Sequence, residues 1–193
     1  MTVFERSTSI FVIGLVAASA PLVAQKGPAP SMGHLSREVV ELACAPTLTF
    51  TAPAPSLLVT GGQDSFSKHS YAPGDLITIN AGTDNGIEVG QEYFVRRVQP
   101  PRGRISHQNP AAIRTSGWVR VYAVDKTMSL VTVSHACETV DVGDYLEPFV
   151  LPEPVVADAN PPKPQKENYG RIMLGTDRRT VFAKDDFFVV DRG

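Results

Sequence analysis

The chain has 193 residues, of which 18 are Lys or Arg and 20 are Asp or Glu, so its formal net charge is -2. This length allows one ordinary domain, or one small domain with extensions. The near-neutral charge argues against a general nucleic-acid-binding protein, which normally carries a basic excess. Because 20% of the residues are charged and 42% are hydrophobic, the chain is neither wholly disordered nor membrane-filling.

The first 24 residues have the order of a signal peptide. A polar start with Arg6 precedes an apolar run over residues 10–20, and small residues follow before Gln25. Charged start, short apolar core and small-residue cleavage site are the three parts of an export signal. The apolar run is too short to favour a transmembrane helix. We therefore expect an exported protein, in the periplasm, at the cell surface or secreted.

Two cleavage sites fit the leader. Cleavage after Ala20 would place Pro21 next to the scissile bond, which hinders the peptidase, so we favour cleavage after Ala24. An uncleaved N-terminal anchor is the alternative. In both cases the rest of the chain lies outside the cytoplasm, with no transmembrane span once the signal is removed.

Two cysteines remain, Cys44 and Cys137. In an oxidising compartment an even number permits one disulfide, but spacing alone does not show whether these two side chains meet. His135 and Cys137 would supply half of a metal site. Because the sequence offers no two further ligands at a suitable spacing, we expect no bound metal. We also expect no cofactor and no catalytic residues, since no nucleophile elbow, zinc-protease motif or phosphate loop occurs.

Residues 25–56 are rich in proline and predict an extended tether. One short helix is expected within it, over residues 36–43, with Ser36 as its N-cap. Three apolar residues fall on one face of that helix: Leu35, Val39 and Leu42.

Short strands dominate the middle of the chain. Segments rich in Val, Ile, Tyr, Phe and Thr alternate with Gly, Pro, Asn and Asp turns. The expected strands are 57–60, 76–80, 92–98, 117–124, 129–135 and 145–150. In the fourth of these, Val119 and Val121 face one way and Trp118, Arg120 and Tyr122 face the other. A tight turn at 125–128 makes 118–124 and 129–135 the clearest hairpin.

No strand is followed by a long amphipathic helix, which favours antiparallel pairing. The predicted fold is all-β, a small antiparallel β-barrel or sandwich over residues 57–151, with Pro-rich extensions and a partial second β unit. Residues 99–116 interrupt the strand order and are expected to form an exposed loop insertion.

A Pro-rich linker, residues 152–168, leads to a segment that repeats part of the first unit. Ala72, Asp75 and Gly82 recur 111 residues later, and the apolar residues between them recur as well. Residues 169–193 are thus expected to be a truncated second β repeat. Because two strands form no core of their own in water, the repeat docks on the first unit, receives residues from another chain, or belongs to a longer protein. We favour the last alternative.

The glycine and strand pattern of residues 74–97 and 117–145 resembles a known module. It reads Gly74-Asp75, a strand, Asn80-Ala81-Gly82, a turn ending at Gly90 and a strand ending at Arg97, with a later Gly143-Asp144 before the last strand. This order is similar to the β-rich module of exported bacterial envelope proteins, including the C-terminal domain of the flagellar assembly protein T family and modules that accompany LysM domains. The resemblance implies a structural or accessory envelope role. Turn glycines and the aspartates that follow them account for the pattern physically.

A basic segment lies between Glu92 and Asp125, where no acidic residue occurs. The residues that would contact an anionic ligand are Arg96, Arg97, Arg102, Arg104 and Arg114. Such a loop would bind anionic envelope polymers or lipid headgroups, each basic residue adding roughly 1 kcal/mol or less. The alternative is a solvated loop whose arginines pair with acids elsewhere.

The sequence therefore favours a non-catalytic exported envelope protein with a structural, assembly or accessory role. Its partners would be the cell wall or envelope proteins, and no nucleic acid is expected. Two alternatives stay open: a module that binds an anionic or glycan ligand through residues 96–114, and an accessory domain of an envelope hydrolase truncated at residue 193.

Overall fold

The structure, a computed structural model, describes residues 35–64, 68–99, 110–153, 159–160, 163, 170–175, 181–184 and 186–190. Within these residues the protein is all-β, as the sequence predicts, with antiparallel sheets and one short α-helix. The predicted leader, residues 1–24, lies outside the described residues, as does most of the linker 152–168.

The helix α1 (Arg37–Cys44) starts one residue later than expected. Ser36 is its N-cap, and the Ser36 hydroxyl oxygen accepts a hydrogen bond of 3.3 Å from the Val39 amide. The face that packs is rotated from the predicted one. Leu35 contacts the sheet as expected, but the helical residues beside it are Val40, Ala43 and Cys44. Cys44, on this packed face, is covalently bonded to Cys137 beside the sheet, a contact that apolar spacing alone could not reveal.

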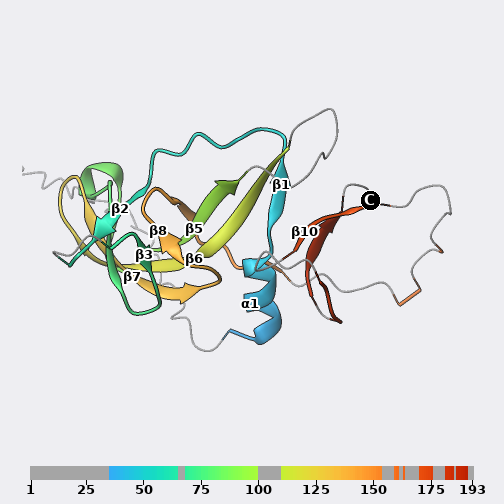
Figure 1. Cartoon of the computed structure of the whole chain (residues 1–193). Helices are drawn as coiled ribbons and strands as arrows, with labels where there is room; N and C mark the ends of the chain where they lie inside the picture. The colour runs from blue at the N-terminus through green and yellow to red at the C-terminus, as the bar shows by residue number, and fades with distance from the viewer. Residues whose placement is uncertain are drawn as a thin grey trace, which may run out of the picture.

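Seven strands form the main sheet, in the order β2-β4-β7-β6-β5-β9, with β1 paired to the start of β6 (Figure 1). These strands are β1 (Thr47–Thr49), β2 (Val59–Gly62), β4 (Leu76–Ile79), β5 (Glu92–Gln99), β6 (Ala111–Val124), β7 (Ser129–Ala136) and β9 (Tyr145–Pro148). All their pairings are antiparallel. Two further short strands, β3 (Ser70–Tyr71) and β8 (Val140–Asp141), pair with each other, and a short 3-10 helix, η1 (Thr83–Asn85), precedes β5.

The sheets of the described residues do not close into a barrel, so the sandwich-like form of the prediction fits them. The two ends of the main sheet nevertheless approach each other. One isolated bridge joins Leu58 to Tyr145, and the Leu146 amide donates a hydrogen bond of 2.9 Å to the Leu57 carbonyl. The sheet therefore curls around its apolar face.

The core lies inside this curl and follows the alternation of the strands. Val119 and Val121 of β6 are buried there with residues of β4 and β7, while Trp118 faces the opposite side. Tyr122 is exposed. The predicted alternation of this strand is confirmed. The hairpin of β6 and β7 is confirmed as well, with Val124 opposite Ser129 and the turn between them closed by the Asp125 amide.

Two boundaries differ from the prediction. The loop expected over 99–116 is shorter, because residues 111–116 belong to β6 and pair with β5 and β1. Proline and arginine in this segment suggested a loop, but the prolines precede the strand. The tether 25–56 contains β1, whose three residues are too few to give a strand signal in the sequence.

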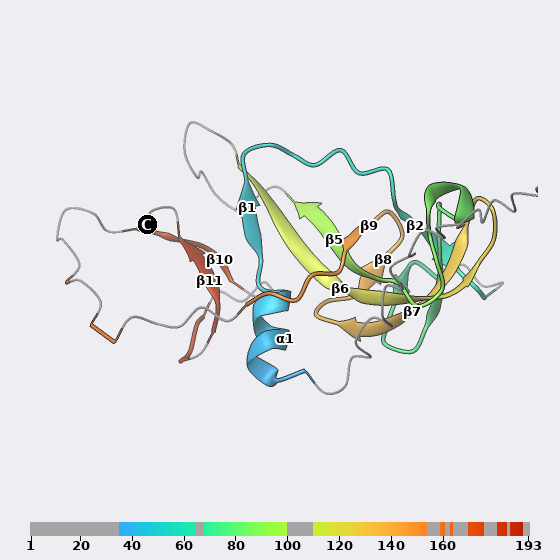
Figure 2. The ribbon, with the colours of Figure 1, turned by 180° about the vertical axis from the view of Figure 1, so that it is seen from behind.

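The second unit contributes a separate antiparallel pair, β10 (Ile172–Gly175) and β11 (Phe188–Val190). This hairpin lies beside α1, away from the curled part of the main sheet, as the two opposite views in Figures 1 and 2 both show.

Candidate functional site

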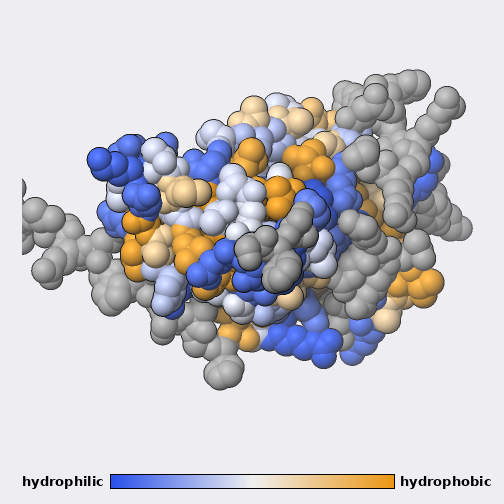
Figure 3. All heavy atoms as spheres, turned by 60° about the vertical axis from the view of Figure 1, so that its left-hand side comes forward, coloured by the Kyte–Doolittle hydropathy of each residue, from blue (hydrophilic) through white to orange (hydrophobic). Residues whose placement is uncertain are grey.

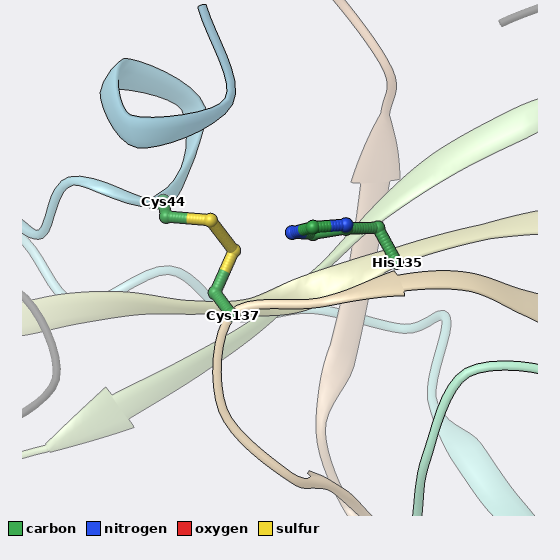
Figure 4. Close-up of side chains that lie close together, drawn as sticks. All are labelled: Cys44, His135 and Cys137. Carbon is green, nitrogen blue, oxygen red and sulfur yellow. A yellow bond between two sulfur atoms is a disulfide. The ribbon is translucent and has the colours of Figure 1, made fainter. Parts of the chain in front are cut away.

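A disulfide joins α1 to the sheet. Cys44 is the last residue of the helix, and Cys137 follows β7 directly. Their Cα atoms are 5.5 Å apart, and the bond spans 93 positions of the chain. The sequence left this pairing open, and the structure makes it (Figure 4). The closed loop includes all strands from β1 to β7, so the cross-link holds most of the module.

His135 lies next to the disulfide, with its ring directed toward the sulfur atoms (Figure 4). The imidazole stacks on the Trp118 indole, with ring centroids 4.2 Å apart and an angle of 17° between the planes. Burial lowers the pKa of His135 below the ordinary value of 6.5, so the ring is neutral at pH 7.

The ligand atoms of Cys44, His135 and Cys137 lie within 4.8 Å of one another. The sequence expectation considered only His135 and Cys137, because it could not bring Cys44 to them. Thiolates bind metal ions, whereas these two sulfurs are bonded to each other. The three residues would thus offer a Cys₂His ligand set after reduction of the disulfide, while in the oxidised form the cluster is a cross-link with a stacked imidazole.

Aromatic residues complete this outer cluster. Phe94 meets the Trp118 ring edge-on at 6.2 Å, and Phe149 lies 4.5 Å from Phe94 between ring centroids. Trp118 is only 3% exposed because α1 covers it. The sequence analysis placed Trp118 on the face opposite Val119 and Val121 but did not predict the cluster, because α1 and Phe149 that complete it are far away in the sequence.

A buried ion pair lies on the other side of β5. Both carboxylate oxygens of Asp144 accept hydrogen bonds from the Arg97 guanidinium, at 2.6 and 2.8 Å. The Ser116 hydroxyl donates to the same carboxylate at 2.8 Å, and the Asp141 amide does so at 3.0 Å. The bond to Asp144 raises the pKa of Arg97. Since Asp144 is 3% exposed, this network satisfies a carboxylate that would otherwise be costly to bury.

Two aspartates of the segment 141–144, Asp141 and Asp144, share this arginine. Asp141 also binds Arg97, at 2.7 Å, so both carboxylates converge on one guanidinium. The sequence also contains the adjacent pair Asp185-Asp186, of which Asp185 lies outside the described residues.

The arginines of the basic segment also have acidic partners. Arg96 pairs with Glu147 at 2.8 Å, and Arg114 pairs with Glu138 at 2.8 Å. Arg97 holds Asp144, as described above. Arg102 and Arg104 lie outside the described residues. Three of the five residues expected to contact an anionic ligand are therefore used in ion pairs within the fold.

An open cavity of about 740 Å³ separates α1 from the hairpin of β10 and β11. Charged residues of both signs line it, together with one aromatic residue: Arg37, Glu38, Glu41, Lys184, Asp186 and Phe187. On the face shown in Figure 3, hydrophobic residues lie interspersed with hydrophilic ones. The described part of the chain holds no helix with the length and hydrophobicity that a membrane span requires.

Comparisons of the chain with family models, with curated proteins and with solved structures give no match, so the functional argument rests on the residues of this chain alone.

Proposed function

We propose that this chain is a non-catalytic exported envelope protein with a structural, assembly or accessory role. The observation that carries the proposal is the disulfide between Cys44 and Cys137, which is built into the packing of α1 on the sheet. Disulfides persist in exported proteins and are rare in reducing compartments. The leader-like order of residues 1–24 supports the same location.

The use of charge supports a structural role. The ion pairs of Arg97, Arg96 and Arg114 connect strands or turns that are far apart in the sequence. Burial is the main cause that raises the pKa of Tyr145 to about 12, so its phenol is neutral. The three ion pairs join separate parts of the fold, and their arrangement needs no substrate to account for it.

The test is expression from the native start codon in a bacterial host, followed by fractionation and intact-mass measurement. We expect the chain outside the cytoplasm, without residues 1–24 and with Cys44 and Cys137 oxidised. A full-length chain with free thiols in the cytoplasm would refute the proposal.

A retention assay on isolated cell envelopes separates this role from binding through the basic segment. We expect the double variant Arg102→Ala/Arg104→Ala to be retained like the unchanged chain. Loss of retention in that variant, with normal folding, would favour the ligand-binding alternative.

A further inference from the structure

Three residues that can bind metal ions meet on the outer face of the sheet: Cys44, His135 and Cys137. A bulge in β7 places the imidazole on that face. Trp118 of β6 lies opposite His135, whereas the next residue of β6, Val119, lies opposite Val133, so Ser134 is an extra residue in β7. Strict alternation would put His135 on the core side with Val133, and the extra residue turns it to the side of Trp118 instead.

The helix supplies the third member of this group, the Cys₂His cluster. α1 ends at Cys44, and the helix face that packs on Trp118 brings this cysteine to Cys137. The two cysteine Cα atoms are 5.5 Å apart, although 93 positions separate the residues in the sequence. The sequence expectation of no bound metal rested on two missing ligands, and Cys44 is one of them.

The spacing of the ligand atoms suits one zinc ion. The two sulfurs and an imidazole nitrogen lie within 4.8 Å of one another. With Zn–S bonds of about 2.3 Å and Zn–N bonds of about 2.0 Å, two ligand atoms on one tetrahedral zinc ion are about 3.5–3.8 Å apart. Once the sulfurs are no longer bonded to each other, rotation about the Cα–Cβ bonds of Cys44 and Cys137 can reach this separation, because their Cα atoms are already 5.5 Å apart.

The imidazole is oriented for this role. Figure 4 shows the ring of His135 directed toward the sulfurs, and its stacking on Trp118 fixes the plane of the ring. Metal-binding histidines depend on such a second contact for their orientation. Among the described residues no hydrogen bond to the nitrogens of His135 occurs, so a metal ion would displace no protein partner.

The chemistry of the ligands favours zinc over the hard cations. Thiolates and imidazole select soft or borderline ions such as Zn²⁺, whereas Mg²⁺ and Ca²⁺ prefer oxygen ligands. In the described part of the chain the cluster contains these three ligands and no fourth. Since all three residues are only partly buried, water can take the remaining position of a tetrahedral zinc ion.

We propose that reduction of the disulfide converts the Cys₂His cluster into a Zn²⁺ site held by Cys44, His135 and Cys137, with water as the fourth ligand. A dithiol reductant supplies two electrons and two protons: the bond between Cys44 and Cys137 breaks, two thiols form, and the reductant becomes a disulfide. Zn²⁺ then replaces both thiol protons, which pass to water, and forms two Zn–S bonds and one Zn–N bond.

The zinc ion joins the same two segments as the disulfide. In both states α1 stays on the sheet and covers Trp118, so the module keeps a cross-link under reducing conditions. This inference goes beyond the proposed function and does not rest on it. Export and oxidation are tested on the oxidised chain, whereas zinc binding is tested on the reduced one, so either can fail without the other.

The test is a titration of the full chain with Zn²⁺ in the absence of oxygen, in competition with a chromophoric chelator. A phosphine keeps the cysteines reduced, because a dithiol would itself bind zinc. We expect one tightly bound Zn²⁺ per reduced chain, with release of about two protons, and no such binding to the oxidised chain. Absence of binding to the reduced chain, or equal binding to the oxidised one, would overturn the proposal.

The variant His135→Phe tests the imidazole, because a phenyl ring can keep the stack on Trp118 but offers no nitrogen. It should weaken zinc binding by the reduced chain at least about tenfold. His69→Phe, the same change at an exposed histidine outside the cluster, should leave the affinity unchanged. Equal affinity in His135→Phe and the unchanged chain would refute the Cys₂His ligand set.

Urea unfolding decides the case in which reduction loosens α1. Zn²⁺ should raise the unfolding midpoint of the reduced chain and return the emission of Trp118 to that of the oxidised chain. The variant Cys44→Ala/Cys137→Ala should not respond to Zn²⁺. An equal response of this variant would place the metal elsewhere in the chain and contradict the proposal.

Discussion

Removal of the disulfide should destabilise the whole module, because the bond closes a loop that contains β1 to β7. The perturbation is the double variant Cys44→Ala/Cys137→Ala, compared with the oxidised chain. With a sequence separation of 93, the chain-entropy relation gives a loss of about 4.6 kcal/mol in the free energy of unfolding at 25 °C. This is a large part of the 5–15 kcal/mol that stabilises a typical domain.

The assay is urea unfolding followed by the fluorescence of Trp118, the one tryptophan in the chain. Its indole is buried under α1 and stacked on His135, so its emission reports both the helix and the sheet. Reduction of the unchanged chain is the second arm, since it breaks the bond without replacing either side chain. The alanine variant must not respond to the reductant.

A loss below about 1 kcal/mol in both arms would refute the reasoning. A shift of Trp118 emission to longer wavelength before unfolding, with an unchanged midpoint, would show that the bond holds only α1. In that case the helix would separate from Phe94 and Trp118 while the curled sheet stayed folded, and the loop-entropy argument would fail.

Three further predictions follow from the same contacts. Arg97→Met should lower the free energy of unfolding by about 3–5 kcal/mol, because it leaves the buried Asp144 carboxylate without its arginine. The control Arg37→Met removes the exposed pair with Glu41 and should cost less than about 0.5 kcal/mol. Urea unfolding compares the two variants. Burial lowers the pKa of His135 in the folded state below the ordinary value of 6.5. The unfolded state therefore binds more protons in acid, and the free energy of unfolding should fall as the pH drops from 7.5 to 5.5. His135→Phe should reduce this pH dependence, measured by urea unfolding at both pH values. Gly117→Ala should cost about 1–3 kcal/mol in a thermal unfolding assay, because the added Cβ would collide with the His135 carbonyl of the neighbouring strand.

Local patterns predicted the local structure well. Alternation along 118–122 gave the two faces of β6, and the turn at 125–128 gave its hairpin with β7. The aspartate after Gly74 indicated a carboxylate that binds nearby amides, and Asp75 does so. In each case the residues that determine the geometry are within a few positions of one another.

Long-range partners could not be predicted. Arg97 and Asp144 are 47 residues apart, and nothing in either neighbourhood selects the other. The same holds for Cys44 and Cys137, and Cys44 lies on the helix face that packs, which the sequence did not select. Very short strands such as β1 were missed because their pairing depends on the position of β6.

The hairpin of β2 and β4 and the hairpin of β10 and β11 show, within one molecule, the difference between what neighbouring residues determine and what distant residues determine. Residues 172–190 reproduce the register shift of the first unit, the aspartate turn in which Asp186 corresponds to Asp75, and the aromatic ring that covers the strand glycine, because neighbouring residues encode all three. They do not reproduce its burial, because Val131 and Val133 of β7 lie far away in the sequence and cover the first copy.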